Sequence, residues 1–266
     1  MSESIAPHPR RLQNRLLWKL TLAVRLALGG ALFLVLVVAA ATVGWFLSAR
    51  RMFPFSQLIF RSMLRVLGVR LASEGRRQLT PRRGYVYIFN HASFLDHFVL
   101  ASQVPSFLIG VEKIESRRIP LYGFLTRWWG NIAIDRRNPE QAIRTIANAQ
   151  GILAAGVSIC VAPEGTRSRD GRVGAFKRGG FQIAADMKAP LVPVSIIGMN
   201  DVNPDGHLLL RSGLVRLVFH PPIDIDGTPI EVVATRVRDQ ICSVGLPRRE
   251  TRVGVSTATA TGGPSG

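Results

Sequence analysis

His91 and Asp96 are the residues whose types and spacing best suit proton transfer. They lie in the stretch that starts at Asn90, directly after the apolar run 85–89. On a continuous helix two side chains five positions apart would diverge, but if His91 lies in a loop and Asp96 in a first helical turn, the carboxylate reaches the imidazole N–H. The imidazole would then take a proton from a hydroxyl, which contributes roughly 10²- to 10⁴-fold in rate. A capping role for Asp96 is the alternative, and His97 is the competing base.

A second polar cluster, Pro163 to Ser168, follows the apolar run 157–161. Gly165 would let backbone N–H groups approach an anion, and Arg167 would hold phosphate oxygens as a planar fork. Glu164 would orient Arg167 or a substrate hydroxyl. An ordinary polar turn is the alternative.

Three further basic residues lie next to the ends of predicted strands or helices, and they are Lys113, Arg136 and Lys177. A phosphate or a thioester oxyanion would meet a cation at such positions. A solvated surface charge is the alternative for each of them.

Short apolar runs alternate with helical patterns around these residues, and this alternation predicts an α/β domain. Several runs are apolar on both faces, which is typical of a sheet covered by helices on both sides. A polar cluster at a strand end is where such sheets commonly place a site. The predicted strands are 85–89, 107–111, 131–134, 157–161, 191–197 and 214–219, and the predicted helices are 94–103, 120–129, 139–155, 179–187 and 230–244.

An uncharged stretch from Leu26 to Ser48 is long enough to cross a bilayer. A helix of its 23 residues would reach about 34 Å, against a hydrocarbon core of about 30 Å. Arg50 and Arg51 follow it in place of a cleavage site, so we expect a retained anchor. Because basic residues flank both ends, the positive-inside rule leaves open a plain span and a bent hairpin that dips into the bilayer and returns.

The segment 53–67 has apolar residues at helical spacing and two arginines on another side. It is either an interfacial helix or a core helix of the α/β domain. These patterns divide the chain into a basic segment over 1–25, an anchor and interfacial helix over 26–70, an α/β domain over 71–250 and a disordered tail over 251–266.

Size and charge narrow the class of protein. The 266 residues are 47% hydrophobic, enough for one domain with a substantial core plus an appended segment. The formal net charge of +17 predicts an acidic partner, which is nucleic acid, anionic lipid or a phosphorylated substrate. Cys160 and Cys242 lack the spacing of zinc ligands, so we expect no metal site, and Cys160 is expected to be a small buried hydrophobe.

Taken in this order, the motifs resemble those of the glycerolipid acyltransferase family, whose first motif is NHxSxxD and whose third is PEGTRS. In this sequence they read Asn90 to Asp96 and Pro163 to Ser168. The second motif resembles Gly123 to Arg136 and the fourth resembles Leu191 to Val194. Phe176, Lys177 and Gly179 match the family's FKxG segment, and the departure is Ala162, where the family often has an aromatic residue.

The resemblance implies an acyltransferase domain over 71–250 in which helices flank a sheet, with an N-terminal membrane helix or helical hairpin. It implies transfer of a fatty-acyl group from acyl-CoA or acyl-carrier protein to the free hydroxyl of 1-acylglycerol-3-phosphate, giving phosphatidic acid for phospholipid biosynthesis. No cofactor is expected, because a thioester is already activated. His91 would be the general base and Asp96 its orienting partner. The substrate contacts would be Lys113, Arg136, Glu164, Gly165, Thr166 and Arg167.

The expected partners are a lysophospholipid acceptor, the acyl donor and a membrane with anionic lipids, with the domain on the cytoplasmic face of the inner membrane and no nucleic acid. Glycerol-3-phosphate, a lyso-ornithine lipid or another lysophospholipid is the alternative acceptor. A non-enzymatic basic membrane protein is the alternative of another class, and it would depend steeply on salt but not on His91. A serine hydrolase is disfavoured because the sequence has no G-x-S-x-G turn.

Overall fold

Seven strands form one mixed sheet in the computed structural model of the chain, which describes residues 9–81, 83–135, 153, 155–204, 209–225 and 227–249. The order of the strands across the sheet is β1-β7-β6-β2-β5-β3-β4, and every neighbouring pair is parallel except β6 with β7. The strands are β1 (Val69–Glu74), β2 (Val86–Phe89), β3 (Leu108–Lys113), β4 (Ile132–Ile134), β5 (Ser158–Val161), β6 (Leu191–Ile197) and β7 (Gly213–Phe219).

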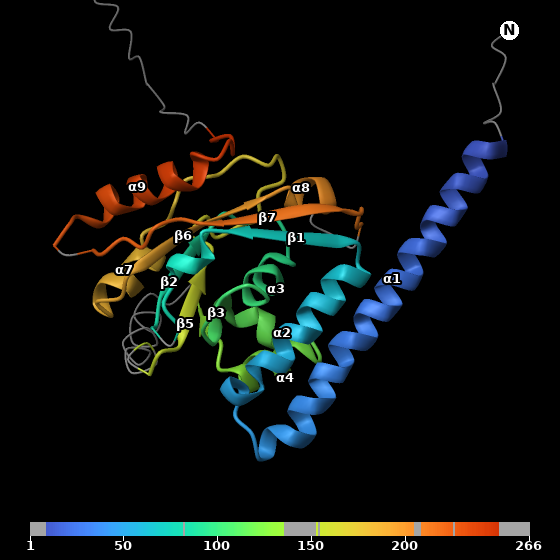
Figure 1. Cartoon of the computed structure of the whole chain (residues 1–266), viewed down its shortest axis with the longest axis horizontal. Helices are drawn as coiled ribbons and strands as arrows, with labels where there is room; N and C mark the ends of the chain where they lie inside the picture. The colour runs from blue at the N-terminus through green and yellow to red at the C-terminus, as the bar shows by residue number, and fades with distance from the viewer. Residues whose placement is uncertain are drawn as a thin grey trace, which may run out of the picture.

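Helices cover both faces of this sheet, so the predicted fold class is confirmed (Figure 1). Helices α7 and α9 pack on one face, while α2, α3 and α4 lie on the other (Figure 1). The central strands β2 and β5 are buried along their whole length, because they have covered faces on both sides. The helices are α1 (Pro9–Thr42), α2 (Ala49–Val66), α3 (Asp96–Ala101), α4 (Tyr122–Trp129), α7 (Gly179–Asp186), α8 (Met199–Val202) and α9 (Ile230–Cys242), with short 3₁₀ turns η1 (Val43–Trp45), η2 (Arg76–Gln78) and η3 (Ile114–Arg118).

The first two helices form a hairpin, which is one of the two arrangements that the sequence leaves open. Helix α1 runs for 34 residues, the chain turns at η1, and α2 returns beside α1 (Figure 1). Gly29 allows the close approach, since a Cβ there would lie 3.0 Å from Leu67 Cδ2. Trp45 and Phe46 at the tip are 87% and 84% exposed. Within the part of the chain that the structure describes, one helix, Leu17–Trp45, is long and apolar enough to cross a membrane.

Helix α2 buries one face in the domain, as the core-helix alternative for 53–67 predicts. Phe53 packs edge-on against Phe107 with ring centroids 5.4 Å apart, and Phe60 packs against Phe98 at 5.3 Å. Other apolar residues of α2, among them Leu58, are exposed. The hairpin and the sheet therefore share one apolar core, which extends from α1 to α9.

All six predicted strands are present, each with its ends within two residues of the expected positions. Strand β1 was not predicted, and it begins at Val69, inside the segment expected to be the anchor. The predicted helix over 139–155 and the predicted tail over 251–266 lie outside the described residues, apart from Leu153 and Ala155.

Candidate active site

The site begins where β2 ends and the chain leaves the sheet. The side chain of Asn90 pairs with the backbone of Ile196 in β6, donating from Nδ2 to the carbonyl at 2.9 Å and accepting the N–H at Oδ1 at 2.7 Å. Ser93, which is fully buried, donates to Oδ1 of Asn203 at 2.7 Å. These two polar side chains fix both ends of the loop that carries His91.

Asp96 lies in the first turn of α3 and folds the loop back onto itself. Its Oδ2 accepts three hydrogen bonds, from His91 Nδ1 at 2.8 Å, Ala92 N–H at 2.7 Å and Ser93 N–H at 2.9 Å. The carboxylate therefore both caps the loop and orients the imidazole, and the predicted geometry of His91 and Asp96 is present. Its other oxygen, Oδ1, is buried and has no hydrogen-bond partner among the residues that the structure describes.

This arrangement determines which nitrogen of His91 can act as a base. Asp96 Oδ2 accepts hydrogen bonds from two backbone N–H groups, so this oxygen carries no proton of its own and can only accept from His91. The proton of the contact between them therefore lies on Nδ1 of His91. The neutral ring then has its lone pair on Nε2, which is the nitrogen that can remove a proton from a hydroxyl.

His97, the competing base, has a different environment. Burial, followed by the nearby charge of His91, lowers the pKa of His97 from 6.5 to about 4. Its ring lies 5.8 Å from that of His91, centroid to centroid, while the carboxylate of Asp96 is bonded to His91. Cys160 is buried in β5, where burial raises the pKa of its thiol to about 12, so it is the inert apolar residue that the sequence predicts.

The loop after β5 is tied directly to the backbone of His91. Glu164 Oε1 accepts the N–H of His91 at 2.9 Å, and the carbonyl of His91 accepts the N–H of Ser168 at 2.7 Å. Glu164 Oε2 accepts the N–H of Gly174 at 2.8 Å. Burial raises the pKa of Glu164 above 4.5, and the two backbone N–H groups oppose that rise. Both oxygens of Glu164 face protein backbone, so its role as a substrate contact stays a prediction.

A cavity of about 770 Å³ opens beside His91. Its lining includes four more of the predicted site residues, Lys113 at the end of β3 and Gly165, Thr166 and Arg167 after β5, but not Glu164 or Lys177. Gly165 adopts a φ of 73°, which favours glycine and forms the tight turn after β5. Arg136 lies outside the described residues.

One wall of this cavity comes from the helical hairpin, which the sequence patterns did not assign to the site. It is apolar and contains Leu26, Gly29, Gly30, Phe33, Met63 and Leu67. Lys113 and Arg167, whose side chains are exposed, also line the cavity. A cavity with a cationic rim and an apolar wall suits a molecule that has an anionic head and a hydrocarbon chain.

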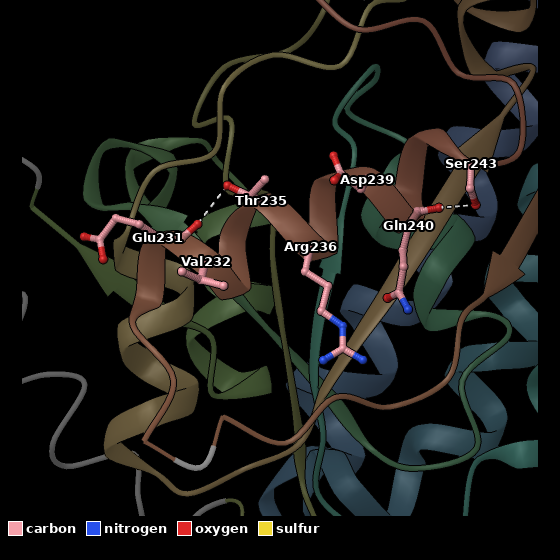
Figure 2. Close-up of a pocket in the computed structure, with 7 residues that line it drawn as sticks. All are labelled: Glu231, Val232, Thr235, Arg236, Asp239, Gln240 and Ser243. Carbon is pink, nitrogen blue, oxygen red and sulfur yellow. Dashed lines mark hydrogen bonds between the residues drawn. The ribbon is translucent and has the colours of Figure 1, made fainter.

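A second hollow, along α9, lacks such an arrangement (Figure 2). Its hydroxyl groups bond to their own helix or its end, since Thr235 donates to the carbonyl of Glu231 at 2.9 Å and Ser243 to that of Gln240 at 2.7 Å. Glu231 and Asp239 form ion pairs with arginines that lie outside the hollow. The cavity at His91 is therefore the candidate active site.

The comparisons with known proteins agree with this geometry. Residues 70–197 match the family model described as Acyltransferase. The chloroplastic 1-acyl-sn-glycerol-3-phosphate acyltransferase LPAT1 of Arabidopsis thaliana is 34% identical over 157 residues, which are 59% of this chain and 43% of that protein. The human 1-acyl-sn-glycerol-3-phosphate acyltransferase alpha is 31% identical over 181 residues, 66% of this chain and 64% of that protein. The chain thus spans less than two thirds of the length of these relatives.

The fold also matches a solved structure. The 1-acyl-sn-glycerophosphate acyltransferase PlsC from Thermotoga maritima aligns with a TM-score of 0.66 over 83% of this chain and 95% of that chain, at 24% identity. The family motifs at His91 and Glu164 fall inside the matched region, at the edge of the sheet where the cavity lies. Over residues 70–197, just under half of its length, the chain is similar to the acyltransferase family.

Proposed function

We propose that this protein transfers a fatty-acyl group from acyl-CoA or acyl-carrier protein to the free hydroxyl of 1-acylglycerol-3-phosphate, giving phosphatidic acid. The observation that carries this proposal is the 2.8 Å contact between His91 and Asp96 beside a cavity that is lined by two cations and by apolar residues of the hairpin. The names of the matched relatives support the choice of acceptor.

In the proposed reaction, Nε2 of His91 takes the proton of the acceptor hydroxyl as its oxygen attacks the carbonyl carbon of the thioester. A C–O bond forms and the C–S bond breaks. The leaving thiolate then takes the proton from the imidazolium, whose charge Asp96 stabilises through Nδ1. A thioester is already activated, so the scheme uses no metal and no organic cofactor.

The cations of the cavity have separate roles in this scheme. Arg167 would hold the phosphate of the acceptor as a fork, together with backbone N–H groups at Gly165 and Thr166. Lys113 would stabilise the oxyanion or a phosphate from the carboxyl end of the neighbouring strand β3. Arg136 is proposed as a further phosphate contact from its place in the second motif.

The hairpin would bring the site to its lipid substrate. Trp45 and Phe46 are large apolar side chains at an exposed tip, where they would enter a bilayer. The net charge of +17 would favour a surface with anionic lipids. We propose that the catalytic domain lies on the cytoplasmic face of the inner membrane, as expected from the family resemblance.

The test is acyl transfer by the purified protein with two donors, an acyl-CoA and the matching acyl-carrier protein, and three acceptors, lysophosphatidate, glycerol-3-phosphate and a lyso-ornithine lipid. Lysophosphatidate is expected to give phosphatidic acid, and His91→Ala to lower kcat by about 10²-fold or more with an unchanged melting temperature. His97→Asn is expected to lower kcat less than His91→Ala. A parental rate in His91→Ala would overturn the mechanism, and a faster product from another acceptor would overturn the substrate.

A further inference from the structure

After α9 the chain packs against the loop 163–174, which contains the PEGTRS motif. Residues 246–249, here called the C-terminal strap, lie alongside the segment that follows the PEGTRS motif. The N–H of Val173 donates to the carbonyl of Pro247 at 2.8 Å, and the N–H of Arg249 donates to the carbonyl of Val173 at 3.0 Å. Val173 is 1% exposed, and a parallel β-bridge joins it to Arg248. The strap thus adds one short strand-like pairing over the buried Val173.

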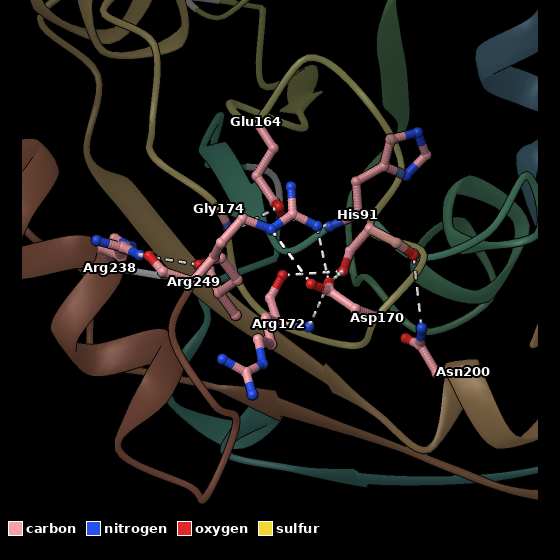
Figure 3. Close-up of polar contacts among 10 residues, drawn as sticks. His91, Glu164, Asp170, Arg172, Gly174, Asn200, Arg238 and Arg249 are labelled. Carbon is pink, nitrogen blue, oxygen red and sulfur yellow. Dashed lines mark hydrogen bonds and ion pairs between the residues drawn. The ribbon is translucent and has the colours of Figure 1, made fainter. Parts of the chain in front are cut away.

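The side chains of two arginines stabilise this pairing through hydrogen bonds (Figure 3). Arg238 of α9 donates from Nη2 to the carbonyls of Val173 and Arg249, both at 2.9 Å. Arg249 forms a fork with Asp170, with Nη2 to Oδ1 at 2.7 Å and Nε to Oδ2 at 3.3 Å. The Arg249 guanidinium, first of all through these hydrogen bonds, holds the pKa of Asp170 well below its usual range.

From Asp170 the contacts continue to the catalytic histidine. The Ser168 hydroxyl lies 3.0 Å from Asp170 Oδ1 and 2.9 Å from the carbonyl of Arg172, either of which can accept its proton, and the N–H of Ser168 donates to the carbonyl of His91 at 2.7 Å. On the other side of the loop, Glu164 bridges Gly174 N–H and His91 N–H. The backbone of His91 is therefore held at both its N–H and its carbonyl by the loop 163–174, whose far end is held by the strap.

We propose that Arg249 is a positioning residue for acyl transfer, holding the loop 163–174 through Asp170 so that this loop keeps the backbone of His91 in place beside the cavity. Figure 3 shows the His91 ring turned away from the Asp170–Arg249 pair, so Arg249 acts through the loop and not on the substrate. The inference rests on the proposed function. A half-exposed ion pair contributes little to global stability, whereas a displacement of about 1 Å at a reacting group costs roughly 10²-fold in rate.

The neighbouring residue offers a matched control. Arg248 pairs with Asp239 at 2.8 Å, with side chains 51% and 49% exposed, close to the 50% and 46% of Arg249 and Asp170. Asp239 lies on α9 and is not connected to the loop 163–174 by the pairings above. The variants are Arg249→Gln, Asp170→Asn, their double and Arg248→Gln.

The first readout is hydrogen exchange at the backbone N–H groups of His91 and Ser168, which does not depend on activity. Arg249→Gln is expected to raise exchange at both about 10-fold over the parent, and Arg248→Gln to leave it unchanged. Equal exchange in Arg249→Gln and Arg248→Gln would overturn the inference even if the protein acylated no acceptor tested.

The second readout is steady-state kinetics with lysophosphatidate, which also tests the proposed function through the parent protein. Arg249→Gln is expected to lower kcat about 10-fold, with KM within about 2-fold and an unchanged melting temperature. The double variant should be no slower than the worse single, because both changes break one contact. Additive losses, a parental kcat in Arg249→Gln, or an equal loss in Arg248→Gln would contradict the positioning role.

Discussion

Replacing Asp96 with asparagine separates the charge of this residue from its geometry. Its Oδ2 accepts hydrogen bonds from His91 Nδ1 and from the N–H groups of Ala92 and Ser93, whereas its buried Oδ1 has no partner in the described part of the chain. An asparagine can therefore keep its carbonyl at the Oδ2 position and put its NH₂ at the Oδ1 position. The loop should remain folded, at a cost of about 1–3 kcal/mol for a buried amide that lacks an acceptor.

The effect on rate follows from the lost charge. In the proposed reaction His91 becomes an imidazolium whose Nδ1 lies 2.8 Å from Asp96 Oδ2. With charge centres about 4 Å apart and an effective dielectric constant of about 20, the attraction is about 4 kcal/mol. Since about 1.4 kcal/mol corresponds to a tenfold change in rate, Asp96→Asn should lower kcat about 10³-fold.

The assay is single-turnover acyl transfer to lysophosphatidate at saturating donor, with circular dichroism to follow the fold. Asp186→Asn is the matched control, because Asp186 is exposed on α7, away from the loop. If folded Asp96→Asn protein turned over within about tenfold of the parent, the carboxylate would not be stabilising an imidazolium, and the assignment of His91 as the base would fail.

Three further predictions follow from the same structure. Because burial holds the pKa of His97 near 4, the unfolded chain binds a proton that the folded chain does not between about pH 6.5 and pH 4, and stability should fall as pH falls through this window. The melting temperature of His97→Asn should therefore depend less on pH than that of the parent. Equal pH dependence of the two melting temperatures would contradict this prediction. Arg167→Gln should raise KM for lysophosphatidate about 10-fold with little change in KM for the donor, and a change confined to kcat would contradict its role as a phosphate contact. Replacing both Trp45 and Phe46 with serine should weaken binding to phosphatidylglycerol vesicles about 10²-fold in a sedimentation assay. The control Val232→Ser, which changes an exposed apolar side chain of α9, should leave this binding unchanged.

The parts of the structure that the sequence predicts well are those that depend on local patterns. The turn that joins His91 to Asp96 could be inferred because both residues lie within one strand-to-helix connection. Strands β2, β5 and β6 could be inferred because their residues are apolar on both faces, as buried strands require. Strand β1 was missed because it is an edge strand that pairs with β7 alone, and of its residues only Val69 is buried, so no alternation marks it.

The features that the sequence did not predict depend on contacts between residues that are distant along the chain. An uncharged helix shows its length but not its packing partner, so nothing in the stretch from Leu26 to Ser48 showed that Gly30 and Phe33 line a catalytic cavity. Glu164 is the sharper case. Its partners are the backbone N–H groups of His91 and Gly174, and a motif of side chains does not reveal a contact to a peptide group 73 residues away.

The order of the strands explains how motifs that are distant in sequence form one site. His91 and Glu164 lie in the loops that follow β2 and β5, and Lys113 is the last residue of β3. The parallel order β2-β5-β3 places β5 between the other two strands. Their carboxyl ends therefore meet at one edge, with the PEGTRS loop between the base and the lysine. In that central position one loop can hold the backbone of His91 through Glu164 while it turns Gly165 and Arg167 toward the cavity. A change that displaced β5 relative to its neighbours would thus disturb base, phosphate contact and lysine together, whereas a change at Lys113 would affect its own contact alone.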